Sequence, residues 1–167
     1  MTDKEITNLL KTDKNITDPP KKSMAIFQGS LRNNFKLESI DGKEKFKAFI
    51  RVNEKISESF SIGLDYISDE GKSICLLRCN GKHGIHKNHN TGEEFFDYHI
   101  HKATQKAIDN DENPEQYAYI TKDYATWQDA LLYFLNYINV LNYREHFPFL
   151  QQPNLFGTTN NDEVILI

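Results

Sequence analysis

Five of the six histidines in the sequence lie close together: His83, His86, His89, His99 and His101. His99 and His101 are two residues apart in a run that alternates polar and apolar side chains, which predicts a strand with both imidazoles on one face. Imidazole titrates near neutral pH, so two rings on one face can act as a general base and a general acid. The pattern therefore favours proton-transfer chemistry.

Groups that bind phosphate lie next to these histidines. Arg78 and Asn80 end the preceding predicted strand, and short connections would bring them to the same edge as the histidines. In metal-free RNA cleavage one histidine takes the proton of the 2′-hydroxyl, the other protonates the 5′-oxygen leaving group, and an arginine stabilises the charge on the phosphorane. The residue types thus predict a metal-independent endoribonuclease of toxin type that uses no cofactor. Its candidate catalytic residues are His99, His101, Arg78 and His83, and its candidate RNA-binding residues are Asn80, Lys82 and Lys102.

Two other interpretations of the histidines stay open. Histidines at i and i+2 on a strand are suitable metal ligands, with Cys79 or His83 completing a tetrahedral site and Asp97 as a partner behind a ligand. No Cys-x-x-Cys or His-Glu-x-x-His motif accompanies them, so we expect no metal. In the third interpretation His99 and His101 only hydrogen-bond loop carbonyls, and the other histidines are solvated.

The composition is that of one soluble domain without a membrane segment. Of 167 residues, 38% are hydrophobic and 26% are charged, and no apolar run approaches the length of a membrane helix. The sequence opens with mixed charge rather than a signal pattern, and its two cysteines, Cys75 and Cys79, cannot form a disulfide framework. We therefore expect a cytoplasmic protein.

The net charge of −4 argues against a protein that coats nucleic acid through bulk charge. The segment from residue 78 to residue 106 differs from the rest, because it is net positive by two. It holds Arg78, Lys82, Lys87, Lys102 and Lys106 against Glu93, Glu94 and Asp97. A local basic site is therefore compatible with an acidic chain.

The hydrophobic pattern predicts an α+β fold. Thr2 and Glu5 form a capping box that begins a short helix, and Thr126 begins a second, amphipathic helix near the C-terminus. Between them, alternating runs predict an antiparallel meander of about five strands, the last of them from about residue 94 to residue 102, whereas residues 23–34 and 80–93 read as loops. We expect residues 1–146 to form a single domain and residues 147–167 to form an extended, mobile tail.

The tail carries a pattern of its own. Gln152, Leu155 and Phe156 resemble the Gln-x-x-Leu-Phe motif with which many bacterial proteins dock into the DNA sliding clamp. Leu155 and Phe156 would enter an apolar pocket while Gln152 hydrogen-bonds at its rim. The alternative is that the two apolar side chains fold back onto the core.

The segment from Leu76 to His101 resembles an uncharacterised family of small bacterial proteins found on mobile elements and prophages. The shared features are the opening Thr-x-x-Glu helix, the Arg-x-Asn-Gly-x-His motif from Arg78 to His83, and the His-x-His strand. The resemblance implies a mobile-element context and a cognate antitoxin or host protein as a partner. It also leaves open a non-catalytic protein that inhibits or recruits a host or defence protein.

Overall fold

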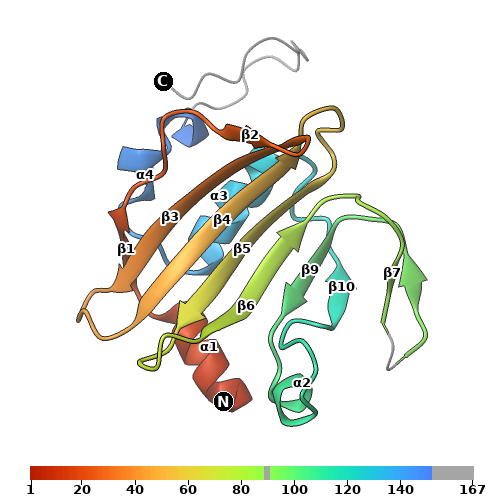
Figure 1. The fold of residues 1–167 in the computed structure, drawn as a ribbon, viewed down its shortest axis with the longest axis horizontal. Coiled ribbons are helices and arrows are strands. Elements are labelled where there is room, and N and C mark those ends of the chain that lie inside the picture. The colour runs from red at the N-terminus through yellow and green to blue at the C-terminus, as the bar shows by residue number, and fades with distance from the viewer. Residues whose placement is uncertain (89–90, 152–167) are drawn as a thin grey trace.

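The computed structural model describes residues 1–88 and 91–151. Its centre is an eight-stranded antiparallel sheet with the order β1-β3-β4-β5-β6-β9-β10, in which β2 pairs with β3 as well. The strands are β1 (Lys14–Asp18), β2 (Ala25–Phe27), β3 (Ser30–Ser39), β4 (Lys45–Asn53), β5 (Phe60–Ile67), β6 (Ser73–Asn80), β9 (His99–Lys102) and β10 (Ala118–Ile120). A separate two-stranded ribbon, β7 (His86–Lys87) and β8 (Glu94–Phe95), lies beyond the β10 side of the sheet (Figure 1).

The helices are α1 (Asp3–Lys11), α2 (Gln105–Asp109), α3 (Trp127–Tyr137), α4 (Tyr143–His146) and the 3-10 helix η1 (Pro148–Gln151). Of these, α3 packs on one face of the sheet against β5 and β6. In Figure 1, α3 lies behind the central strands and α4 lies to the side of β3, near β1, and the opposite face of the central strands is turned to the viewer without a helix over it. No helix among the described residues is long and apolar enough to cross a membrane.

The α+β class and the antiparallel sheet are confirmed, but the predicted count of five strands is wrong. β1, β2 and β10 were missed because they are short, and β2 is exposed along its whole length and so carries no burial alternation. The strand predicted from about residue 94 to residue 102 forms two strands in the structure. Glu94–Phe95 forms β8 of the ribbon, and only His99–Lys102 pairs with the sheet.

Both long helices begin where the capping residues predict. The Thr2 side chain accepts a hydrogen bond from the Glu5 N–H and the Glu5 carboxylate accepts one in return, which completes the capping box of α1. The Thr126 hydroxyl accepts from the Asp129 N–H at the start of α3.

A buried lysine joins the C-terminal ends of these two helices. Lys14 is fully buried, and its ammonium donates to the carbonyls of Leu10, Thr12 and Ile138 at 3.1, 2.7 and 3.1 Å. Helix C-termini present carbonyls without intrahelical partners and the negative end of the helix dipole. One cation therefore satisfies the ends of α1 and α3 together.

The core extends past the domain boundary predicted at residue 146. Phe147 is buried, and its ring meets Phe35 edge-on at a centroid distance of 5.4 Å. Phe149 and Leu150 also pack against the core. The segment predicted to dock on the sliding clamp, Gln152, Leu155 and Phe156, lies outside the described residues.

Candidate functional site

The site lies where β6 pairs with β9. Asn80 is opposite His99 and Arg78 is opposite His101, so these four side chains share one face of the sheet. The alternate residues Cys79 and Ile100 are fully buried in the core on the other face. The period of two therefore places the His-x-His pair on the face that the helices leave uncovered.

The ribbon brings a third histidine over this pair. The side chain of Asn88 donates to the Ala118 carbonyl at 2.8 Å and accepts from the Ala118 N–H at 3.1 Å, which ties the ribbon to β10. The same Asn88 Oδ1 lies 3.0 Å from His86 Nε2. The His86 ring is thereby held above His101, with centroids 4.8 Å apart.

His86, His99 and His101 form a triad. One ring nitrogen from each residue lies within 4.8 Å of the other two. The other ring nitrogen of each faces an oxygen acceptor: Asn88 Oδ1 for His86, the Asp97 carbonyl at 2.7 Å for His99, and the Glu115 carbonyl at 2.8 Å for His101.

These partners fix the tautomers. A carbonyl accepts only, and Asn88 Oδ1 is identified as the acceptor because its amide nitrogen donates to Ala118. Each neutral ring therefore carries its proton on the nitrogen that faces the acceptor, and the remaining nitrogen keeps its lone pair. In His99 this lone pair, on Nε2, accepts a hydrogen bond from Asn80 Nδ2 at 3.3 Å. A metal-binding histidine has the same arrangement.

Burial keeps two members of the triad neutral. Desolvation lowers the pKa of His99 to about 4, and the His83, His86 and Arg78 charges act in the same direction. Desolvation, together with the Arg78 charge, lowers the pKa of His101 to about 3. Both imidazoles are thus free bases at neutral pH.

These pKa values give an expected dependence of stability on pH. The unfolded chain binds protons below the ordinary histidine pKa of about 6.5, whereas folded His99 and His101 do not until about pH 4. The free energy of unfolding should therefore fall as the pH drops from 6.5 to 4, by up to about 1.4 kcal/mol per pH unit for each histidine. Urea unfolding at several pH values measures this slope. The His99→Gln/His101→Gln variant should show a shallower slope, and an unchanged slope would contradict the assignment.

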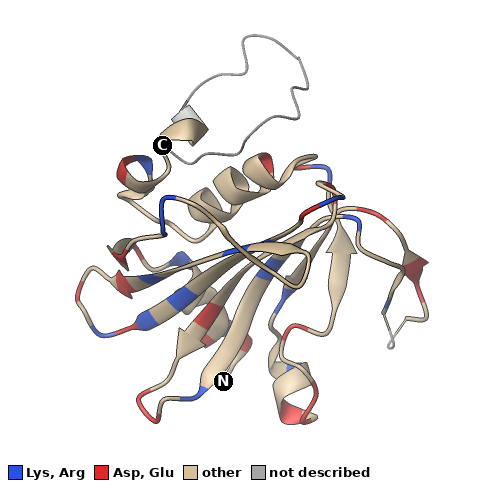
Figure 2. Ribbon diagram, turned by 45° about the horizontal axis from the view of Figure 1, so that its top comes forward, with Lys and Arg blue, Asp and Glu red and all other residues tan. Residues whose placement is uncertain are grey.

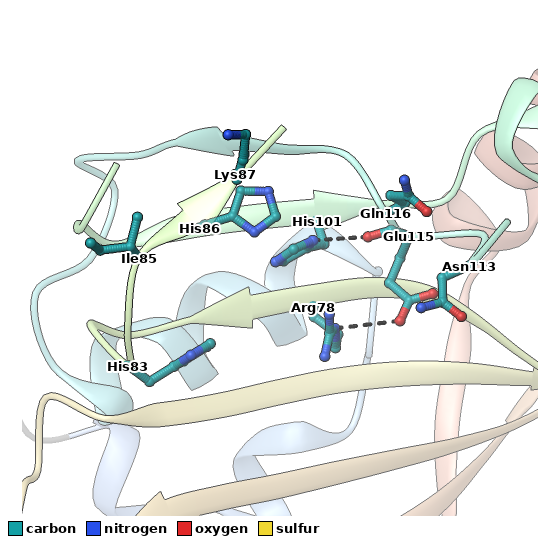
Figure 3. A pocket seen from close by; sticks show the side chains of 9 residues that line it. All are labelled: Arg78, His83, Ile85, His86, Lys87, His101, Asn113, Glu115 and Gln116. Carbon is teal, nitrogen blue, oxygen red and sulfur yellow. Dashed lines mark hydrogen bonds and ion pairs between the residues drawn. The ribbon is translucent and has the colours of Figure 1, made fainter. Parts of the chain in front are cut away.

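Two members of the triad, His86 and His101, line a pocket of about 450 Å³, whereas His99 is buried and does not line it. Figure 3 shows Arg78, His83, Lys87 and Glu115 around it, with Arg78 below His101 and Lys87 above His86. Glu115 contacts the site through two groups. Its side-chain carboxylate lies 3.6 Å from Arg78 Nε, and its backbone carbonyl accepts a hydrogen bond from His101. The pocket thus brings the imidazoles of His83, His86 and His101 together with two cationic side chains, Arg78 and Lys87.

The structure brings most, but not all, of the predicted site residues together. His83 lines the pocket with its ring centroid 5.4 Å from that of His99. Lys82 instead lies 3.5 Å from Glu58 and over the Tyr98 ring, and Lys102 points to the helix side, 3.5 Å from Thr7 on α1. Of the metal ligands considered from the sequence, Cys79 lies in the core, away from the triad.

Three contributors were missed from the sequence: His86 as a triad member, Asn88 and Glu115. His86 and Asn88 lie in a segment that reads as a loop, and Glu115 lies between residues 103 and 125, where the sequence pattern is ambiguous and predicts no element. Their roles depend on pairing across the ribbon and β10, for which local periodicity gives no signal.

Comparison with known proteins identifies the family. A family model described as "Family of unknown function (DUF6978)" matches residues 1–140. The chain belongs to the DUF6978 family. The matched range includes Arg78, the triad and α3, so the whole site lies within the family's domain. No curated protein and no solved structure matches the chain.

Proposed function

We propose that His86, His99 and His101 bind a transition-metal ion such as Zn²⁺, and that this member of the DUF6978 family uses it to hydrolyse phosphodiester bonds in RNA. One observation carries the proposal: three imidazoles converge, two of them in the wall of one pocket, and each has one ring nitrogen hydrogen-bonded to an acceptor. Imidazole is a preferred ligand for Zn²⁺ and its neighbours.

Three protein ligands are typical of a catalytic rather than a structural metal site. Structural zinc sites use four protein ligands, whereas catalytic sites keep one position for water or substrate. Ligand nitrogens around a tetrahedral zinc are about 3.4 Å apart, so the triad must close slightly from its 4.8 Å limit. This closure requires His86, which Asn88 holds above His101, to move toward the other two rings.

The pocket supplies what a hydrolytic reaction needs. A metal held by His86, His99 and His101 would supply Lewis-acid activation of a water. In the hydrolysis overall, the oxygen of that water bonds to phosphorus, the bond from phosphorus to the leaving oxygen breaks, and the leaving oxygen takes up the proton. Arg78 and Lys87 would stabilise the charge that develops on the phosphate oxygens. Asn80 Nδ2 donates to His99 Nε2 at 3.3 Å, so the Asn80 amide has to turn away when His99 holds a metal.

Metal-free cleavage, the chemistry expected from the sequence, is the second candidate. It requires one protonated imidazole at neutral pH, and burial makes His99 and His101 poor at holding a proton. His83, which is exposed on the rim of the pocket, would then have to be the acid. A bacterial mobile-element origin, a role as a toxin with a cognate antitoxin, and a non-catalytic role against a host protein are further proposals.

Cleavage of total RNA separates these candidates. Protein stripped with EDTA should be inactive and should recover activity with Zn²⁺ or Mn²⁺, and the His99→Ala/His101→Ala variant should stay inactive. Cleavage that persists in EDTA would replace the metal mechanism with the metal-free one. No cleavage under any condition would remove the enzyme proposal and favour a protein partner.

Asn88→Ala is expected to weaken metal binding about 10- to 100-fold, because it removes the acceptor that orients His86. Isothermal titration with Zn²⁺ measures the change. Asn113→Ala is the matched control. Asn113 lines the same pocket, and within residues 1–88 and 91–151 its side chain forms no hydrogen bond with the triad. Equal affinities for the two variants would show that His86 is not a ligand.

A further inference from the structure

The uncovered face of the sheet carries a continuous polar surface that leads to the triad. The strand register places one row of side chains across five strands: Arg32, Arg51, Ser61, Asn80 and His99. A second row runs beside it: Asn34, Phe49, Gly63, Arg78 and His101. We refer to these two rows as the platform.

Polar atoms without partners gather on the platform. Within the described residues, the buried side-chain nitrogen and oxygen atoms that lack a hydrogen bond are Arg32 Nε, Ser61 Oγ, Arg78 Nε and Asn80 Oδ1. All four belong to the platform, although Arg78 keeps its ion pair with Glu115. Buried polar atoms are normally paired, so their concentration here indicates a polar ligand.

The same face is basic in an acidic chain. Between β3 and β6 it presents Arg32, Lys36, Lys45, Lys47, Arg51 and Arg78 against Glu38 and Asp65, and one of these cations, Lys36, is ion-paired with Asp18 of β1 at 3.4 Å. Figure 2 shows Lys and Arg recurring along these strands. An excess of cations on one face, in a chain with a net charge of −4, matches a polyanion.

Aromatic rings lie among these cations. The Phe49 ring lies over Gly63, where any Cβ would collide with it, and the Arg51 guanidinium is 5.3 Å from the ring centroid. At the β2 end of the surface, Arg32 lies 4.6 Å from the Phe27 ring, which is 53% exposed. Aromatic rings beside arginines on an open sheet are suited to stacking unpaired bases.

Two hollows connect the platform to the triad. A hollow of about 300 Å³ is lined by Arg51 and Ser61 of the platform, and His83 lines both this hollow and the triad pocket. Phe49 is three strand spacings from His101, which is about 14 Å. A bound strand could therefore lie on the platform and reach the triad.

We infer that the platform binds single-stranded RNA and delivers it to the histidine triad. This inference deepens the proposed function by naming its substrate class, but the binding itself needs no metal. Phe49 and Phe27 can stack only on bases that are not already paired and stacked in a double helix, so the expected ligand is single-stranded. Ser61 Oγ lacks a partner and Ser61 lines the hollow beside Arg51, so this hydroxyl can hydrogen-bond a ribose 2′-hydroxyl, which deoxyribose does not have.

The test is fluorescence anisotropy with a labelled single-stranded RNA of about 12 nucleotides in EDTA, where metal-dependent cleavage cannot occur. Phe49→Leu should weaken binding roughly 5- to 150-fold, and Phe49→Tyr, which keeps the ring, should bind like the wild type. Lys47→Gln should lower the slope of log K against log salt by about 0.7. Tyr119→Ala and Lys72→Gln, an exposed aromatic on the helix side and a lysine in a turn, are the matched controls and should change neither.

Each outcome decides the inference. Preferential binding of RNA, with these losses, supports it. Equal affinity for DNA of the same sequence, tighter binding of duplex RNA, or no effect of Phe49→Leu would overturn it. RNA binding in EDTA without cleavage at any added metal would remove the proposed hydrolysis but keep the platform as an RNA-binding surface. Cleavage of RNA together with unchanged RNA affinity in Phe49→Leu and Lys47→Gln would remove the platform and keep the proposed hydrolysis.

Discussion

The His99→Ala/His101→Ala variant should lose metal binding almost completely, with a dissociation constant for Zn²⁺ that rises by at least about 1,000-fold. The change removes two of three ligand nitrogens, and loss of even a hydrogen bond behind a ligand costs 10- to 100-fold, roughly. Isothermal titration at pH 7 measures the constant, with the folded state of the variant confirmed by circular dichroism.

His146→Ala is the matched control for this variant. His146 lies in α4, where it contacts Asn142 at 3.3 Å, and it should bind Zn²⁺ like the wild type when replaced. An affinity that survives in the double variant, or a similar loss in His146→Ala, would place the metal away from the triad.

Lys14→Met should lower the free energy of unfolding by about 3 kcal/mol, the largest effect on stability that we expect from a single substitution. The methionine fills the buried volume, but the carbonyls of Leu10, Thr12 and Ile138 lose their donor. Burial lowers the pKa of Lys14 to about 7, so relief of this desolvation offsets part of the loss. Urea unfolding at pH 6.5 measures the difference.

Lys11→Met provides the comparison for Lys14→Met. Lys11 also donates to a helix-end carbonyl, that of Tyr137 at 2.7 Å, but its bond is exposed to solvent. Its replacement should therefore cost no more than about 1 kcal/mol. If both variants were equally stable, the buried contacts of Lys14 would not be what joins α1 to α3.

Much of the fold was predictable because its signals are local. The capping residues Thr2 and Thr126 place both long helices, and alternation in β3 to β6 follows from one buried face. The same alternation placed His99 and His101 together. These features need only the residues within one element.

The rest depends on contacts between distant residues. His86 joins the triad only because Asn88 pairs with Ala118, thirty positions along the chain. Glu115 reaches Arg78 and His101 only because β10 returns beside β9. Lys102 was misplaced for the opposite reason: it follows His101 directly, and the period of two turns it to the helix side.

Titration of the metal-free wild-type protein with Co²⁺, followed by visible absorption at pH 7, tests the metal centre most directly. Co²⁺ replaces Zn²⁺ in sites with nitrogen ligands, and its visible absorption depends on its coordination number and geometry. We expect one equivalent to bind per chain with the intense absorption of a four- or five-coordinate ion, and we expect Zn²⁺ to displace it. A spectrum that stays that of aqueous Co²⁺, or one that is unchanged in the His99→Ala/His101→Ala variant, would contradict the account.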